Sequence, residues 1–157
     1  MSLPQSSLTD PRVETDIPAA RTVRVMLVDD SLVVRSILER IVDGTPGLTV
    51  CASVASAHDA LAFLASEPVD VVVLDIEMPG MNGIDALPHI LRSAVNARVL
   101  ILSSNCVEGG PAAIDALSLG ASDTLAKPGR GWFSGRLAEG LTNRILALAH
   151  PQAHPAP

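Results

Sequence analysis

The chain has 157 residues, of which 48% are hydrophobic and 2% aromatic, and its formal net charge is −6 at pH 7. This length suits one domain with tails, and the hydrophobic fraction is enough for a core of Ala, Val, Leu and Ile. The acidic charge argues against anionic partners, so we expect binding to neither nucleic acid nor a membrane surface. With no signal peptide and no apolar run of membrane-spanning length, the sequence predicts a cytoplasmic protein.

The two ends of the chain differ in composition from the part between them. Residues 1–22 are rich in Pro, Ser, Thr and mixed charge, which is typical of a disordered N-terminal tail. Residues 150–157 consist mostly of Pro, Ala and His and are typical of a linker or tail. We therefore expect a single folded domain over residues 23–149.

Within this domain, short apolar runs alternate with stretches of helical spacing. Buried strands are expected over residues 24–28, 48–54, 69–74, 97–102 and 122–126. Helices are expected over residues 32–42, 57–65, 84–91, 111–119 and 136–149. Strands that alternate with helices in this way predict an α/β fold with a doubly wound, five-stranded parallel sheet.

The first predicted helix is amphipathic. Val33, Ile37, Leu38 and Ile41 share one of its sides, and Ser31 is suited to cap its amino-terminal end.

Pro88 lies within the third predicted helix, 84–91. Proline lacks an amide hydrogen, and its ring clashes with the preceding helical turn. We therefore expect Pro88 either to sit in the first turn of this helix or to kink it.

Charged side chains directly follow three of the predicted strands. Asp29 and Asp30 follow the first strand, Asp75 follows the third, and Lys127 follows the fifth. In a doubly wound sheet the carboxyl ends of parallel strands lie at one edge, so these groups should converge there. Clustered carboxylates suit a hard divalent cation, Mg²⁺ or Mn²⁺. The pattern therefore predicts a metal pocket with a carboxylate nucleophile and a cationic side chain beside it.

Each of these residues also has an ordinary structural explanation. Asp29 and Asp30 can cap the following helix and complement its dipole. Asp75 can form a turn, and Lys127 can be an exposed lysine like most others. The functional interpretation depends on all of them occurring together.

Five segments stand in the order that is typical of one protein family. They cover residues 28–31 (VDDS), 74–83 (LDIEMPGMNG), 102–104 (LSS), 119–121 (LGA) and 127–128 (KP). On these segments the chain resembles the receiver domain of two-component response regulators, over about residues 23–149. The segments 29–35 and 75–79 and the pair Ser103-Ser104 are most similar to the receiver domain of the chemotaxis protein-glutamate methylesterase.

The resemblance implies a flavodoxin-like receiver fold and a phosphoacceptor signalling module, with Asp75 phosphorylated by a sensor histidine kinase. It implies a metal site for Mg²⁺ or Mn²⁺ formed by Asp29, Asp30, Asp75 and the backbone carbonyl of Glu77. Its catalysis would be limited to autophosphorylation and autodephosphorylation. A downstream effector, or an attached methylesterase domain, would read the phosphorylated state.

Two further residues acquire roles from the same resemblance. Lys127 would neutralise charge on the phosphoryl oxygens, and Ser103 would donate a hydrogen bond to one of them. The family often has an aromatic residue three positions before this lysine, where this chain has Thr124. We therefore expect the loop after the fourth strand, rather than an aromatic side chain, to carry the signal.

Two other functions remain open from the sequence. The chain can be the regulatory part of a protein-glutamate methylesterase, although it contains no Gly-x-Ser-x-Gly-type nucleophile elbow of its own. It can also be an independent phosphohydrolase with Asp75 as nucleophile and Glu77 as general acid. Turnover of a generic phosphomonoester would distinguish the phosphohydrolase from a receiver.

Overall fold

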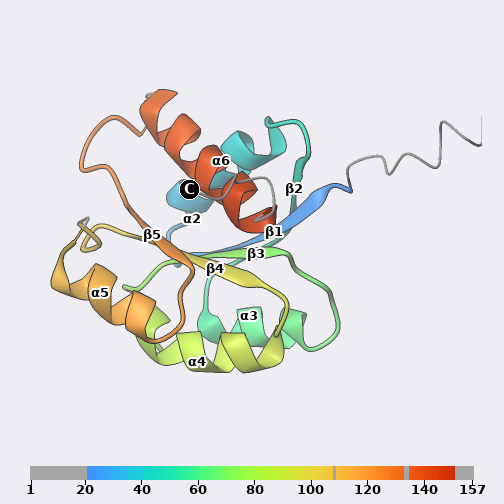
Figure 1. Ribbon diagram of the computed structural model, residues 1–157, viewed down its shortest axis with the longest axis vertical. Coiled ribbons are helices and arrows are strands. Elements are labelled where there is room, and N and C mark those ends of the chain that lie inside the picture. Colours follow the sequence, from blue (N-terminus) through green and yellow to red (C-terminus); the bar gives the residue numbers. More distant parts are fainter. Residues whose placement is uncertain (1–20, 108, 133–134, 151–157) are drawn as a thin grey trace, which may run out of the picture.

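The computed structural model describes residues 21–107, 109–132 and 135–150. Over these residues five strands and five helices alternate in the predicted order (Figure 1). The expected tails at 1–20 and 151–157 lie outside the described residues. The domain boundaries at 23 and 149 therefore remain predictions, although β1 begins at Val23 and α6 ends at Ala149.

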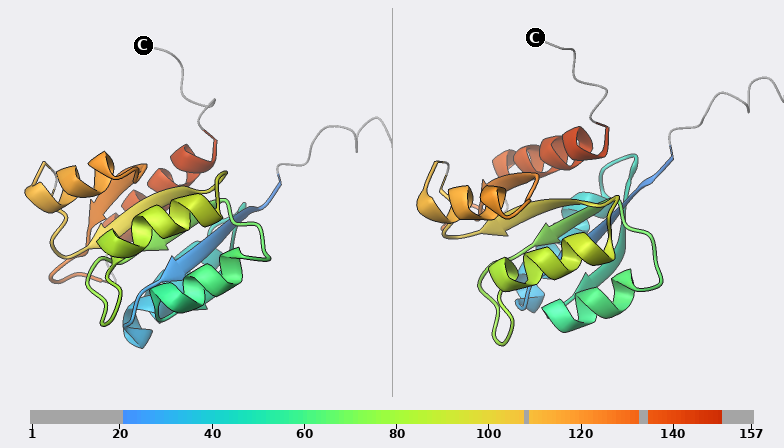
Figure 2. Two further views of the ribbon diagram at one scale, coloured as in Figure 1. Left: turned by 90° about the horizontal axis from the view of Figure 1, so that it is seen from below. Right: turned by 60° about the horizontal axis from the view of Figure 1, so that its bottom comes forward.

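All strands belong to one parallel sheet with the order β2-β1-β3-β4-β5. Their bounds are β1 Val23–Val28, β2 Leu48–Val54, β3 Val71–Leu74, β4 Arg98–Ser103 and β5 Asp123–Ala126. Because the strands are parallel, their carboxyl ends lie at the same edge (Figure 2). The predicted fold class is thus confirmed, with three strands starting one or two residues later than expected and β1 starting one residue earlier.

The helices cover both faces of the sheet. Helices α2 and α6 lie on one face, and α3, α4 and α5 lie on the other (Figures 1 and 2). Their bounds are α2 Leu32–Asp43, α3 Ala57–Leu64, α4 Gly83–Ser93, α5 Pro111–Ser118 and α6 Gly135–Ala149.

Side-chain caps fix where three of these helices begin. Ser31 Oγ accepts a hydrogen bond from the Val34 amide at 3.2 Å, as predicted. Ser56 caps α3 in the same way, and Asn82 caps α4. A cap of this kind contributes about 1 kcal/mol to helix stability. The caps of α2 and α4 also anchor the chain just after the two strand ends that carry aspartates.

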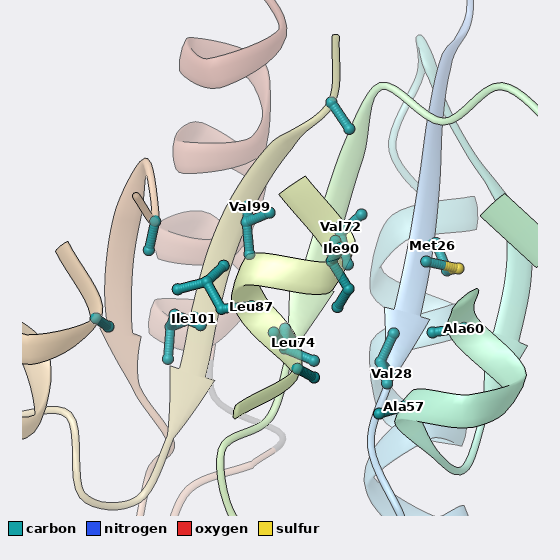
Figure 3. Close-up of a cluster of buried hydrophobic side chains, with 14 of the residues drawn as sticks. Met26, Val28, Ala57, Ala60, Val72, Leu74, Leu87, Ile90, Val99 and Ile101 are labelled. Carbon is teal, nitrogen blue, oxygen red and sulfur yellow. The ribbon is translucent and has the colours of Figure 1, made fainter. Parts of the chain in front are cut away.

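Alternate residues of the central strands form two cores. On the side of α3 and α4, Val28, Leu74 and Ile101 pack with Leu87 and Ile90 (Figure 3). On the side of α2 and α6, the neighbouring strand residues pack with the helix residues Leu38, Val42, Leu141 and Ile145. Burial on both faces makes the central strands a rigid support for residues at their ends.

The apolar residues on one side of α2 differ in their burial. Leu38 and Val42 of α2 are buried, but Val33 is 69% exposed. Val33, Ile37 and Ile41 line an apolar groove toward α6, and Ile41 also packs against the core on that face of the sheet. Because the helix is broadly apolar, the spacing of its apolar residues does not show which of them face the groove and which face the sheet.

Pro88 lies inside α4 and beyond its first turn, so the first of the two expected placements, the first turn or a kink, is wrong. The helix begins at Gly83 and continues to Ser93. Since neighbouring Leu87 and Ile90 are fully buried against the sheet, packing holds the helix across the missing hydrogen bond.

Candidate functional site

The residues expected to converge meet at the carboxyl edge of the sheet. Asp29 directly follows β1, Asp75 follows β3, and Lys127 follows β5. Ser103 is the last residue of β4, between the strands that precede Asp75 and Lys127. The adjacent central strands therefore place all four side chains at one edge, as the sequence predicted.

Lys127 bridges the two buried aspartates. Its Nζ lies 2.7 Å from Asp29 Oδ2 and 3.2 Å from Asp75 Oδ1. The lysine side chain is 12% exposed, and each aspartate side chain is 3% exposed. Burial lowers the pKa of Lys127, but the hydrogen bond to Asp29 and the charges of both carboxylates outweigh it and raise this pKa. Lys127 is therefore a fixed positive charge, and not the exposed lysine of the ordinary explanation.

Asp75 is held in an environment that disfavours its charge. Burial and then the negative charge of Asp29 raise the pKa of Asp75 to about 6, against the opposing effect of Lys127. The Glu77 amide donates a hydrogen bond to Asp75 Oδ1 at 3.3 Å. Asp75 is ionised at neutral pH, but only at a cost in stability, so a cation or a covalent change at this carboxylate can relieve that cost.

This pKa predicts how stability depends on pH in metal-free buffer. An unfolded aspartate loses its proton near pH 3.8, whereas folded Asp75 keeps its proton up to about pH 6. Between these values the folded state binds more protons, so stability should fall as pH rises, and the fall should be complete above pH 6. Asp75→Asn removes this effect, and its stability relative to wild type should rise by on the order of 2 kcal/mol between about pH 4 and pH 7. Urea unfolding followed by circular dichroism measures this difference, and a pH-independent difference would contradict it.

Local hydrogen bonds orient Asp29 toward the site. Its Oδ1 accepts from the Ser31 amide at 2.9 Å. Its backbone carbonyl accepts from Arg35 Nη1 at 2.7 Å, while Arg35 Nε donates to Ser53 Oγ on β2. Arg35 therefore ties the end of β1 to β2 and keeps the buried carboxylate in place.

The three aspartates fit a hard divalent cation. One carboxylate oxygen each from Asp29, Asp30 and Asp75 lie within 4.8 Å of one another. Asp30 is exposed, whereas the other two are buried, so the cluster opens to solvent on one side. An all-oxygen donor set with room for water is what Mg²⁺ prefers. The expected ligand set with the Glu77 carbonyl remains a prediction.

The side chain of Glu77 is the feature that sequence reasoning missed. Its Oε1 accepts from Ser103 Oγ at 2.7 Å and from Asn105 Nδ2 at 2.5 Å, and its Oε2 accepts from Ser104 Oγ at 3.0 Å. For a receiver domain, only the backbone carbonyl of Glu77 had been assigned a role, and its side chain was considered only as the general acid of the phosphohydrolase alternative. An acid two positions after Asp75, together with a Ser-Ser-Asn run after the fourth strand, was the signal that could have indicated this contact.

The loop after β3 folds back closely on itself. The Gly83 amide donates to the Ile76 carbonyl at 2.8 Å. A Cβ atom at position 83 would lie 2.2 Å from the Asp75 carbonyl oxygen and 2.8 Å from the Ile76 Cα atom. Glycine is therefore needed here for close backbone approach, and the start of α4 presses on the backbone of the candidate nucleophile.

Thr124 leaves space at the position where the family often has an aromatic residue. It is half-buried on β5 and lines a cavity of about 340 Å³. The other walls include Cys106, Ala113, Leu117 and Arg144. A threonine does not fill this volume.

No helix in the described part of the chain combines the length and apolar character needed to span a bilayer.

The sequence and the structure both match known proteins. The family model for the response regulator receiver domain matches residues 25–131. The chain is 42% identical over 116 residues to protein-glutamate methylesterase/protein-glutamine glutaminase 1 of Paramagnetospirillum magneticum, and this match covers 74% of the chain and 30% of that protein. The chain thus spans about a third of the length of the curated relatives that it matches.

Two solved structures show the same fold. The response regulator domain of Thermotoga maritima CheB is similar with a TM-score of 0.76 and 35% identity, covering 83% of this chain and 98% of that one. A chain in the crystal structure of the P1 domain of CheA3 in complex with CheY6 from R. sphaeroides is similar with a TM-score of 0.67 and 34% identity, covering 81% and 98%.

Proposed function

Because this chain belongs to the response regulator receiver domain family, we propose that it is a phosphoacceptor module in which Asp75 takes a phosphoryl group from a sensor histidine kinase. The observation that carries this proposal is the position of Asp75, buried at a strand end between Asp29 and the ammonium group of Lys127. The similarity to CheB and CheY6 supports a chemotaxis system as its setting. This function places the protein in the cytoplasm.

The proposed transfer is a simple exchange at phosphorus. A carboxylate oxygen of Asp75 attacks the phosphorus of a phosphohistidine, and an O–P bond forms as the P–N bond breaks. The electron pair of that bond stays on the imidazole nitrogen, which then takes up a proton. Hydrolysis later breaks the bond between phosphorus and the Asp75 oxygen, releases inorganic phosphate and restores the carboxylate. Catalysis is limited to these two steps.

The residues around Asp75 have distinct parts in this chemistry. Lys127 balances negative charge on the phosphoryl oxygens, since its Nζ already lies 3.2 Å from Asp75 Oδ1. Ser103 contributes a hydroxyl that can donate to a phosphoryl oxygen. Asp29, Asp30, Asp75 and the Glu77 carbonyl would hold Mg²⁺ or Mn²⁺, which when bound would supply further positive charge to neutralise the phosphoryl oxygens.

The test uses a small phosphodonor in place of the kinase. Incubation with acetyl phosphate and millimolar Mg²⁺ should add one phosphoryl group per chain, labile to base and to hydroxylamine, as an acyl phosphate is. Asp75→Asn and chelation of Mg²⁺ should each abolish the adduct, and Asp30→Asn should raise the Mg²⁺ concentration that is needed. Intact-mass spectrometry measures the adduct. A label that persists in Asp75→Asn would place the nucleophile elsewhere.

A second candidate is the regulatory part of a protein-glutamate methylesterase. It is favoured by the curated relatives, which carry that name and of which the chain spans about a third. In this case the phosphorylated domain would act on an attached methylesterase domain rather than on a separate effector. The sequence encoded beyond residue 157 in the parent gene distinguishes the two, since either a methylesterase domain follows there or it does not.

The phosphohydrolase alternative requires Glu77 to act as a general acid. Both carboxylate oxygens of Glu77 already accept hydrogen bonds, from three donors at the end of β4 and in the loop after it, so this side chain is engaged away from a leaving group on Asp75. We therefore expect no multiple-turnover hydrolysis of a generic phosphomonoester.

A further inference from the structure

The Glu77 carboxylate holds the turn that follows β4. Its two oxygens accept from Ser103 Oγ, Ser104 Oγ and Asn105 Nδ2 at 2.7, 3.0 and 2.5 Å. Ser103 is fully buried, whereas Glu77 itself is exposed. The contact therefore joins a surface carboxylate in the loop after Asp75 to the hydroxyl that the proposed phosphoryl group requires.

We propose that Glu77 is a latch that keeps the Ser103 hydroxyl away from Asp75 in the unphosphorylated state, and that phosphorylation opens the latch by taking this hydroxyl. This inference rests on the proposed function and adds a competitor for Ser103 within the same site. Glu77 is in this sense a positioning residue, because it acts through Ser103.

The number of protons on Ser103 makes the competition exclusive. A serine hydroxyl has a single hydrogen to donate. Ser103 Oγ donates to Glu77 Oε1, and Ser103 Oγ itself accepts from the Asn105 backbone amide at 3.3 Å. Ser103 can therefore donate either to Glu77 or to a phosphoryl oxygen on Asp75, and never to both.

Charge favours opening of the latch after phosphorylation. Only one residue separates Asp75 from Glu77, and the Glu77 amide donates to Asp75 Oδ1. Burial, and then the charges of Glu77 and Asp75, raise the pKa of Cys106, so both carboxylates act on the same neighbouring thiol. A phosphoryl group on Asp75 adds negative charge beside Glu77 and weakens the hold of Glu77 on the turn.

The backbone of Ser103 connects the latch to neighbouring segments at the carboxyl edge of the sheet. Its carbonyl accepts from the Lys127 amide at 3.0 Å and from the Cys106 amide at 3.2 Å. A shift of Ser103 toward Asp75 therefore pulls on the end of β5 and on the loop that leads to α5. Release of Glu77 is thus coupled to a change in shape on the α5 and β5 side of the molecule.

The latch can be measured as a loss of affinity for a phosphoryl mimic. If only a fraction of the protein molecules is in the state that can bind the mimic, the apparent affinity is lowered in proportion to that fraction. In the presence of Mg²⁺, Glu77→Ala should bind beryllofluoride about tenfold more tightly than wild type, the factor expected for one charge-assisted hydrogen bond. Glu77→Gln, which keeps one acceptor oxygen, should lie between the two. Glu139→Ala removes an exposed acid from α6 as a matched control and should leave the affinity unchanged.

A double-mutant cycle separates a latch from plain charge repulsion. If Glu77 acts by holding Ser103, then Glu77→Ala should change beryllofluoride affinity less than about twofold in a Ser103→Ala background. If Glu77 only repels the anion, the gain should be equal in both backgrounds, and the proposal would be wrong. Without any ligand, the amide resonances of residues 103–105 in Glu77→Ala should move toward their positions in the wild-type beryllofluoride complex. Unmoved resonances would also overturn the latch.

The outcome distinguishes this inference from the function on which it rests. Wild-type protein that binds no beryllofluoride would contradict the proposed phosphoacceptor function itself. Wild-type protein that binds it with the same affinity as Glu77→Ala would leave that function intact and remove the latch.

Discussion

Replacing Lys127 with methionine is expected to lower the free energy of unfolding by about 3 kcal/mol near pH 8. The substitution removes the cation that two buried carboxylates share and leaves both of them without a countercharge. The Lys127 ammonium contacts both Asp29 and Asp75, and neither carboxylate is exposed to water. Methionine keeps the length and the apolar stem of the side chain, so the loss reports on the charge. Chemical denaturation in metal-free buffer gives the measurement.

The dependence of this loss on pH and on Asp75 provides the control. Lys127 is the main influence that lowers the pKa of Asp75, so its removal should raise that pKa further, and the loss should be smaller near pH 5 than near pH 8. Combining Lys127→Met with Asp75→Asn should recover part of the stability. A loss below about 1 kcal/mol at both pH values would mean that the pair behaves like an exposed one.

Replacing Gly83 with alanine should cost about 3 kcal/mol and also prevent phosphorylation of Asp75, because the new methyl group collides with backbone and not with a movable side chain. The added Cβ would lie 2.2 Å from the Asp75 carbonyl oxygen. The loop after β3 or the start of α4 must therefore shift, and the Asp75 carboxylate shifts with it. Thermal unfolding and the acetyl phosphate assay measure the two effects.

Gly129 offers a matched control for this substitution. It follows Lys127 and Pro128 at the same edge, and a Cβ atom there would meet nothing within 4 Å. Gly129→Ala should change stability by less than about 0.5 kcal/mol and leave labelling intact. Equal effects of the two substitutions would show that the close approach of Gly83 to the backbone of Asp75 and Ile76 does not determine the stability of this loop.

The position of the site was predictable because it follows from topology. Once alternating strands and helices indicate a parallel sheet, residues that directly follow strands must lie at one edge, whatever their separation in the sequence. Asp29, Asp75 and Lys127 needed no more information than that. The cap at Ser31 was predictable for a similar reason, since a cap involves only the adjacent residues.

Features that depend on side-chain packing were not predictable in the same way. Val33 was placed on the same side of α2 as Leu38, but it is exposed and lines a groove toward α6, whereas Leu38 is buried. Pro88 lies inside α4 because tertiary packing overrides its local cost. The Glu77 side chain meets Ser103 only when two loops from different strands come together. Its spacing from Asp75 does not indicate this partner by itself, but only together with the Ser-Ser-Asn run after the fourth strand.

The order of the strands along the chain has a consequence for biosynthesis. Asp29 and Asp75 emerge from the ribosome well before Lys127, which follows the last strand, β5. A nascent chain that pairs β1 with β3 therefore brings two carboxylates together without their cation, and this repulsion adds to the entropic cost of closing long loops. We expect the sheet to become stable only when β5 and α6 are nearly complete, so that the domain folds late in translation and a chain truncated before residue 127 is left for proteolysis.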